Sequence, residues 1–193
     1  MRDASGFAVE VGLMRIRLYP EPVLRETCTP VETFDQGLAV LASGMVRAMH
    51  ENRGLGLAGP QVGVTQCVAI VSPDGEAGHE TVLVNPEIVR SEGKDEHDEG
   101  CLSFPGIYVR VRRAEHVVVR YQDVGGAAHE MEAWGLLARA ILHELDHLDG
   151  RLLVDRMSPV QRVAQRRRLR QLEERYDRRS QEVEMSSEAA DEG

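Results

Sequence analysis

The pattern of hydrophobic and polar residues predicts helices near both ends of the chain, with short strands between them. Apolar residues recur at helical spacing over 35–53, and Gly54 is expected to end that helix. After a glycine-rich loop at 54–63, the pattern changes to short β-rich runs separated by turn signals. The expected strands are 67–71, 81–84, 88–90, 107–111, 116–121 and 129–133.

Helical periodicity returns twice in the last third of the chain. One helix is expected at 134–148, where apolar residues form one face, and an arginine-rich helix is expected at 160–179. Residues 1–12 have the composition of a loose leader, and the small and acidic residues at 180–193 are typical of a disordered tail. This order predicts an α+β fold: short antiparallel or mixed strands around a central helix, with an N-terminal helix and a C-terminal helix.

Length and composition indicate one domain with a proper core. The chain has 193 residues, 42% of them hydrophobic, and a net charge of −9, which argues against a nucleic-acid-binding protein overall. No run approaches the roughly 18 apolar residues of a membrane helix, and the N-terminus lacks the pattern of a signal peptide. We therefore expect a cytoplasmic protein that makes no membrane contact. Three cysteines argue against a disulfide framework and leave a thiolate ligand possible.

The central helix carries the residues His-Glu-Leu-Asp-His at 143–147. Histidines four residues apart project from one face of a helix, so His143 and His147 can share a metal ion. Glu144 is rotated about 100° away, which suits a base acting on water better than a ligand. Asp146 also points away from the shared face, and we expect it to pair with Arg112 or Arg113.

A catalytic metal site needs a third protein ligand and an open position for water. The acidic residues downstream of the helix stand in no convincing setting, and no histidine follows His147. Upstream lies Cys101, although a free cysteine is more often a small buried apolar residue than a ligand, as we expect for Cys28 and Cys67. The residues alone leave the third ligand open.

Three segments of the sequence resemble the signature motifs of the peptide deformylases. They are Gly-Leu-Gly-Leu-Ala-Gly-Pro-Gln at 54–61, Glu-Gly-Cys-Leu-Ser at 99–103 and His-Glu-Leu-Asp-His at 143–147. They occur in the family's order and at similar separations. Gly59, where many members have alanine, is the visible departure. The resemblance implies that residues 1–159 form a peptide deformylase catalytic domain, followed by the basic helix at 160–179 and the acidic tail at 180–193.

The resemblance implies that Cys101, His143 and His147 hold one divalent metal ion. In this family the ion is usually iron(II), although the ligand set would also suit zinc, nickel or cobalt. Glu144 would act as general base on the attacking water and then deliver the proton to the departing amine.

The resemblance also implies how the substrate is held. The side-chain amide of Gln61 and the backbone N–H of Leu102 would donate hydrogen bonds to the formyl oxygen as it becomes an oxyanion. Gly56 would present its backbone to the substrate at close range. The methionine side chain of the substrate would need an apolar pocket. The candidates to line it are Leu55, Leu136 and Ala140, although these residues could equally belong to the core.

The implied function is removal of the N-formyl group from the N-terminal methionine of newly synthesised polypeptides, with release of formate. Two alternatives remain from the residues: a metallopeptidase that cuts ordinary peptide bonds, and a non-catalytic homologue that binds nascent chains. We expect a monomer. Bacterial deformylases dock on the ribosome through a C-terminal helix, and the helix at 160–179, with eight arginines against three acidic residues, could do the same through RNA phosphates.

Overall fold

The computed structural model describes residues 14–191, with side chains described for residues 14–181. The expected leader at 1–12 lies outside the described residues. The helices are α1 (Gln36–Glu51), α2 (Gly135–Leu148) and α3 (Pro159–Asp191), with short 3-10 helices η1 (Pro22–Arg25), η2 (Gly59–Val62) and η3 (Leu153–Arg156). The strands are β1 (Gly56–Ala58), β2 (Val68–Val71), β3 (Thr81–Glu92), β4 (Asp95–Gly100), β5 (Tyr108–Arg113), β6 (His116–Gln122) and β7 (Ala128–Trp134).

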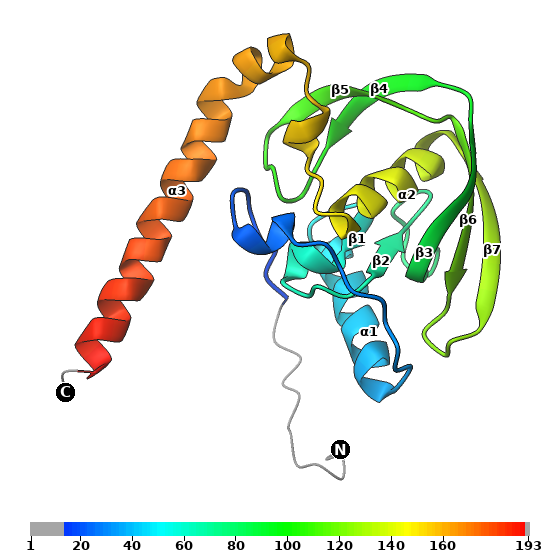
Figure 1. Ribbon diagram of the computed structural model, residues 1–193, viewed down its shortest axis with the longest axis horizontal. Coiled ribbons are helices and arrows are strands. Elements are labelled where there is room, and N and C mark those ends of the chain that lie inside the picture. The colour runs from blue at the N-terminus through cyan, green and yellow to red at the C-terminus, as the bar shows by residue number, and fades with distance from the viewer. Residues whose placement is uncertain (1–13, 192–193) are drawn as a thin grey trace.

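The strands form two antiparallel sheets that enclose α2 (Figure 1). Five strands pair in the order β1-β2-β3-β6-β7, and β4 and β5 form a separate hairpin. One side of α2 packs on the five-stranded sheet through Ala138 and Ile141, which meet Val117 and Val119 of β6 in one buried cluster. The expected α+β fold, with its N-terminal, central and C-terminal helices, is therefore confirmed.

The first helix, α1, begins and ends for local reasons. The side chain of Asp35 caps its N-terminus by accepting a hydrogen bond from the Leu38 N–H. Met45 and Met49 are fully buried on its inner face, against Leu57 of β1 and other apolar side chains of the sheet. This packing fixes the position of β1, which begins at Gly56, a few residues after α1 ends.

The strands differ from the sequence expectation in three places. The glycine-rich loop contains β1 and η2, and the two runs expected at 81–84 and 88–90 belong to one bulged strand, β3. The polar strand β4 was not expected, because its sequence Asp-Glu-His-Asp-Glu-Gly has no apolar alternation. It forms because its acidic residues lie opposite the arginines of β5, with Glu96 facing Arg112 and Asp98 facing Arg110.

The last helix, α3, is attached to the body mainly along its first half, and further on Arg179 forms an ion pair with Glu21 at 3.9 Å. Leu169 and Leu172 pack in a cluster with Phe104 and Tyr19, and the side-chain amide of Gln161 donates to the Arg110 carbonyl at 2.8 Å. The remainder extends away from the body in Figure 1. Its backbone is helical to Asp191, past the end expected at residue 179, since strong helix formers such as glutamate, glutamine and alanine continue beyond that point. Among the described residues, no helix is long and apolar enough to span a membrane.

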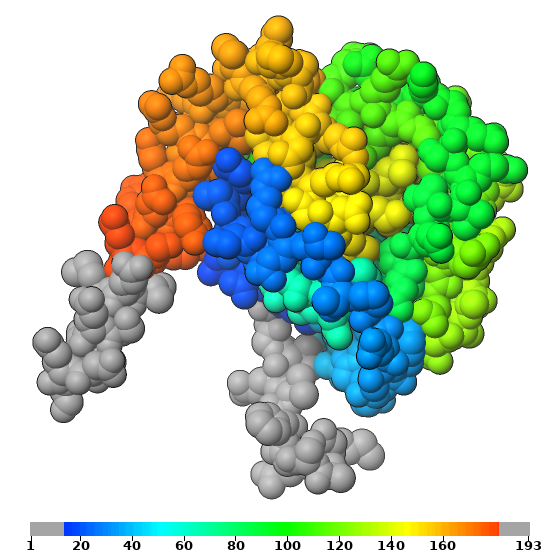
Figure 2. All heavy atoms as spheres, viewed as in Figure 1, coloured from blue at the N-terminus to red at the C-terminus, as the bar shows by residue number. Residues whose placement is uncertain are grey.

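The segment before α1 closes the end of α2. In Figure 2 it lies against the chain that follows α2. The Cys28 N–H donates to the Leu148 carbonyl at 2.8 Å, and Arg25 forms an ion pair with Asp155. Directly after α2, Gly150 has φ of 70°, and a β-carbon there would lie 2.4 Å from the Arg25 carbonyl oxygen. Only glycine fits both the backbone angle and this close approach.

We predict that Gly150→Ala destabilises the protein by about 1–3 kcal/mol, because the added β-carbon must displace the backbone at Arg25. The check is thermal or urea unfolding. Gly78→Ala is the matched control, since Gly78 also has positive φ (90°) but has open space around it. Equal losses of unfolding free energy in the two variants would show that the close approach to Arg25 does not contribute to the effect.

Candidate metal centre

Three side chains from two distant parts of the chain meet at the inner face of α2. His143 and His147 lie one helical turn apart, and Cys101 follows directly after β4. One ligand atom from each of the three residues lies within 4.8 Å of the other two, and the Cys101 sulfur lies 3.2 Å from Nε2 of His147. A thiolate and two imidazoles are a suitable donor set for a divalent transition metal.

The ring of His143 is oriented by Glu99. An Oε2 atom of Glu99 lies 3.1 Å from Nδ1 of His143, and both side chains are buried. A carboxylate at Nδ1 fixes the proton on that nitrogen and leaves Nε2 with a free lone pair for a metal ion. Glu99 and Cys101 are two residues apart, so the same short segment supplies a ligand and orients another.

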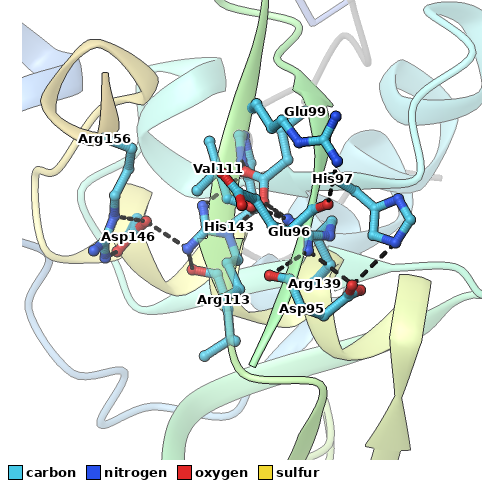
Figure 3. Close-up of polar contacts among 12 residues, drawn as sticks. Asp95, Glu96, His97, Glu99, Val111, Arg113, Arg139, His143, Asp146 and Arg156 are labelled. Atoms are coloured by element: carbon cyan, nitrogen blue, oxygen red, sulfur yellow. Dashed lines mark hydrogen bonds and ion pairs between the residues drawn. The ribbon is translucent and has the colours of Figure 1, made fainter. Parts of the chain in front are cut away.

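Glu99 is the centre of a group of charged residues that are buried except for Arg156 (Figure 3). It accepts two hydrogen bonds from Arg113, at 2.6 Å and 2.9 Å, and one from Arg139 at 2.7 Å. Arg113 also donates to Asp146 at 2.8 Å, which confirms the expected ion pair, and Asp146 accepts a further bond from Arg156 at 2.9 Å. We call these five residues the Glu99 network: Glu99, Arg113, Arg139, Asp146 and Arg156.

The network keeps Glu99 ionised inside the protein. Burial opposes the charged form, but hydrogen bonds from His143 and Arg113, with the charge of Arg113, outweigh it and lower the pKa of the Glu99 carboxyl to about 2. Arg139 extends the network by donating to the backbone carbonyls of Val111 on β5 and Asp95 on β4. The hairpin is thereby attached to α2 at several points.

Glu144 lies beside the three candidate ligands but is not one of them. Its side chain is 3% exposed, and its Oε2 atom has no hydrogen-bond partner within the described part of the chain. Burial raises the pKa of its carboxyl to about 7, against the attraction of His143 and Arg113. A carboxyl with such a pKa can take up and release a proton near neutral pH.

Gly56 is needed at its position because of Glu144. A β-carbon at residue 56 would lie 2.3 Å from Oε1 of Glu144. The structure thus gives a reason for this glycine beyond the close approach of a substrate, since the strand β1 and the glutamate on α2 must pack directly together.

Gln61 is 1% exposed and is held in one orientation. Its Oε1 atom accepts a hydrogen bond from the Ala58 N–H at 2.8 Å, so the amide NH₂ group must point the other way. That group lies 3.3 Å from the Ser103 hydroxyl and 3.6 Å from the Cys101 sulfur. A donor is therefore directed at the candidate metal ligands.

A cavity of about 610 Å³ opens onto this cluster. All four residues expected to contact a substrate line it, with Leu136 exposed and Leu55 and Ala140 partly buried beside Gly56. Gln61, Leu102 and Glu144 share the same lining, whereas His147 lies beneath it with 1% of its surface exposed. The structure thus brings every predicted site residue to one place.

The sequence did not reveal that Glu99 orients His143, or that Arg113 and Arg139 hold Glu99. Glu99 stood in one of the quoted motifs, and Arg139 lies one turn before His143 on the side of α2 that faces the hairpin, where a buried arginine needs a partner. That arginine was the signal that a buried anion lay opposite the helix.

The fold and the buried Cys-His-His cluster beside a free carboxylate define a metal-binding hydrolase. Residues 13–163 match the family model described as polypeptide deformylase. The peptide deformylase of Thermodesulfovibrio yellowstonii is 41% identical over 162 residues, covering 83% of this chain and 98% of that protein. That of Alkalilimnicola ehrlichii is 43% identical over 163 residues, covering 84% and 92%.

Solved structures agree with the sequence comparison. A peptide deformylase from Legionella pneumophila matches with a TM-score of 0.80 and 42% identity, over 86% of this chain and 98% of that one. Arabidopsis thaliana peptide deformylase 1B, in complex with an inhibitor, matches with a TM-score of 0.83 and 38% identity, over 86% and 93%. The chain belongs to the peptide deformylase family.

We predict that Glu99→Gln lowers stability by about 3–5 kcal/mol, because it leaves two buried guanidinium groups without their shared anion. Affinity for zinc should also fall, by about 10–100-fold, because the amide holds His143 less well. Urea unfolding and competitive zinc titration measure the two effects. Glu96→Gln, on the exposed side of the same strand, is the control. Unchanged zinc affinity in Glu99→Gln would refute the role given to the Glu99–His143 contact.

Proposed function

We propose that Glu144, Gln61 and Leu102 carry out the chemistry by which this peptide deformylase removes the formyl group from the N-terminal methionine of new polypeptides and releases formate. The observation that carries this proposal is the unpaired Oε2 of Glu144, buried beside Cys101, His143 and His147 in the cavity that also holds the Gln61 amide. A base, a donor and a metal-binding set then converge on one point.

Cys101, His143 and His147 would hold the metal ion, and we propose iron(II) as the native ion. When bound, such an ion acidifies water and polarises a carbonyl group. Metal analysis of protein purified without oxygen tests the identity of the ion.

Glu144 would take a proton from the water that attacks the formyl carbon and deliver it to the departing amine nitrogen. Its raised pKa supports both halves of this transfer near neutral pH. Its other oxygen, Oε1, packs so close to Gly56 that a β-carbon there would lie 2.3 Å away.

The negative charge that develops on the formyl oxygen needs donors. The Gln61 amide is held by the Ala58 N–H, and the Leu102 N–H donates to no acceptor among the backbone contacts of the described residues. We propose that these two groups stabilise the oxyanion, each by about 3 kcal/mol at the transition state.

The methionine side chain would occupy the apolar part of the cavity. Leu55, Leu136 and Ala140 line it, and Gly56 offers a backbone without a side chain next to the base. We further propose that the enzyme is a cytoplasmic monomer, that its substrates are formylated nascent chains, and that α3 docks on the ribosome.

The docking proposal is supported by the shape and charge of α3. Its attached face uses Gln161, Leu169 and Leu172, which leaves arginines on the exposed face of a helix that extends from the body. Exposed arginines along such a face are suited to RNA phosphates. They are Arg162, Arg166, Arg167, Arg168, Arg170, Arg175, Arg178 and Arg179.

We predict that Glu144→Gln keeps its metal but releases formate from a formyl-Met tripeptide at least 100-fold more slowly, since no base remains. Cys101→Ser should instead lose tightly bound metal. Formate assay and metal analysis on the same samples separate the two effects. Normal turnover by Glu144→Gln would refute the mechanism.

Cleavage of unblocked tripeptides by the wild type would favour a metallopeptidase, and binding of nascent chains without formate release would favour a non-catalytic homologue.

For α3, the prediction concerns Arg166→Glu/Arg170→Glu, one turn apart on the exposed face. The double variant should pellet with ribosomes several-fold less well than the wild type. The slope of log binding constant against log salt concentration should become shallower by about two, which corresponds to two lost phosphate contacts. Arg47→Glu/Arg120→Glu, an equal charge change on exposed residues elsewhere, is the control. Equal binding by the two double variants would contradict docking through α3.

A further inference from the structure

The C-terminus of α1 has a strained residue that faces the substrate cavity. Arg53 adopts φ of 54°. Its N–H donates to the His50 carbonyl at 3.0 Å, and the Gly54 N–H donates to the Met49 carbonyl at 2.9 Å. This pair of bonds is the Schellman ending of a helix, in which the left-handed residue is usually glycine. The folded protein is therefore less stable with arginine at this position than it would be with glycine.

The side chain of Arg53 makes no polar contact that would stabilise the described part of the fold. It is exposed, and no hydrogen bond or ion pair to it exists within residues 14–181. The neighbouring Asn52 already closes the helix, because its amide donates to the Ala48 carbonyl at 2.8 Å. A strained residue without a structural partner is a reason to look for a functional one.

Arg53 lines the mouth of the cavity that contains Glu144 and the metal ligands. Most of the other charged residues of the lining are paired or have a proposed role. Glu99 and Arg139 are paired in the buried network, and Glu144 is the proposed base. Asp98 also lines the cavity, and Arg110 is its direct cross-strand neighbour. Within the described residues, Arg53 is therefore the cation of this lining that makes no ion pair.

The position of Arg53 fixes which part of a substrate it can reach. Two residues of the chain, Gly54 and Leu55, separate it from Gly56, whose α-carbon packs against Glu144. Three Cα–Cα steps of at most about 3.6 Å each place the Arg53 backbone within roughly 11 Å of Gly56, which lies beside the proposed base. An extended substrate with its formyl group beside Glu144 covers the same distance by its second or third residue.

We propose that Arg53 is a specificity-determining residue that favours substrates with an aspartate or glutamate at position 2 or 3. The guanidinium group pairs with that carboxylate at the cavity mouth. This inference rests on the proposed function, because it requires the formyl group to be bound beside Glu144. It adds a preference for sequence beyond the methionine.

The test compares formyl-Met tripeptides that carry glutamate, glutamine or lysine at position 2 or at position 3. For the wild type at low salt, kcat/KM for the glutamate peptide should exceed that for the lysine peptide by about 3–10-fold at one of the two positions. The ratio should decline toward one in 0.5 M salt. Arg53→Gln should abolish the preference, and Arg53→Glu should reverse it in favour of lysine.

Two further variants keep the test independent of folding. Arg53→Gly should lose the charge preference while its melting temperature rises, because glycine suits the left-handed conformation. Arg47→Glu, an exposed arginine of α1 away from the cavity, should keep the preference. Equal kcat/KM for the three peptides at both positions, or an unchanged ratio in Arg53→Glu, would overturn the proposal. Absence of formate release from every peptide, the glutamine one included, would instead overturn the proposed function.

Discussion

The contact on which the site depends is the buried carboxylate of Glu99, held by Arg113, Arg139 and the ring of His143. A charge in the interior is stable only when its partners are complete. Here the partners come from β5 and α2, while Glu99 itself belongs to β4. Satisfying one carboxylate therefore positions the hairpin over the helix, and with it the cysteine two residues further along the chain.

The rest of the fold gives this contact a rigid support. The apolar side of α2 is buried against the five-stranded sheet, and its polar side carries His143, Glu144 and His147 toward the hairpin. On the third side, β1 passes so close that residue 56 must be glycine. The two walls of the cavity are thus the edge strand of one sheet and the end of the other, with α2 as the floor.

Much of this could be predicted from the sequence because its signals are local. The spacing of the two histidines fixes a shared face on any helix, and the periodicity around them predicted α2 to within one residue. The strand β4 escaped prediction because its stability comes from charges on a neighbouring strand and on α2. For the same reason, no spacing along the chain indicated that Glu99 would orient His143, since the two residues are 44 positions apart.

The central claim is that the Glu99 network assembles one metal site from Cys101, His143 and His147. The most direct measurement is X-ray absorption spectroscopy of the full-length protein loaded with one equivalent of zinc, which counts sulfur and imidazole ligands. The account predicts one sulfur and two imidazole nitrogens. A zinc ion without a sulfur ligand, or with a single imidazole, would contradict it.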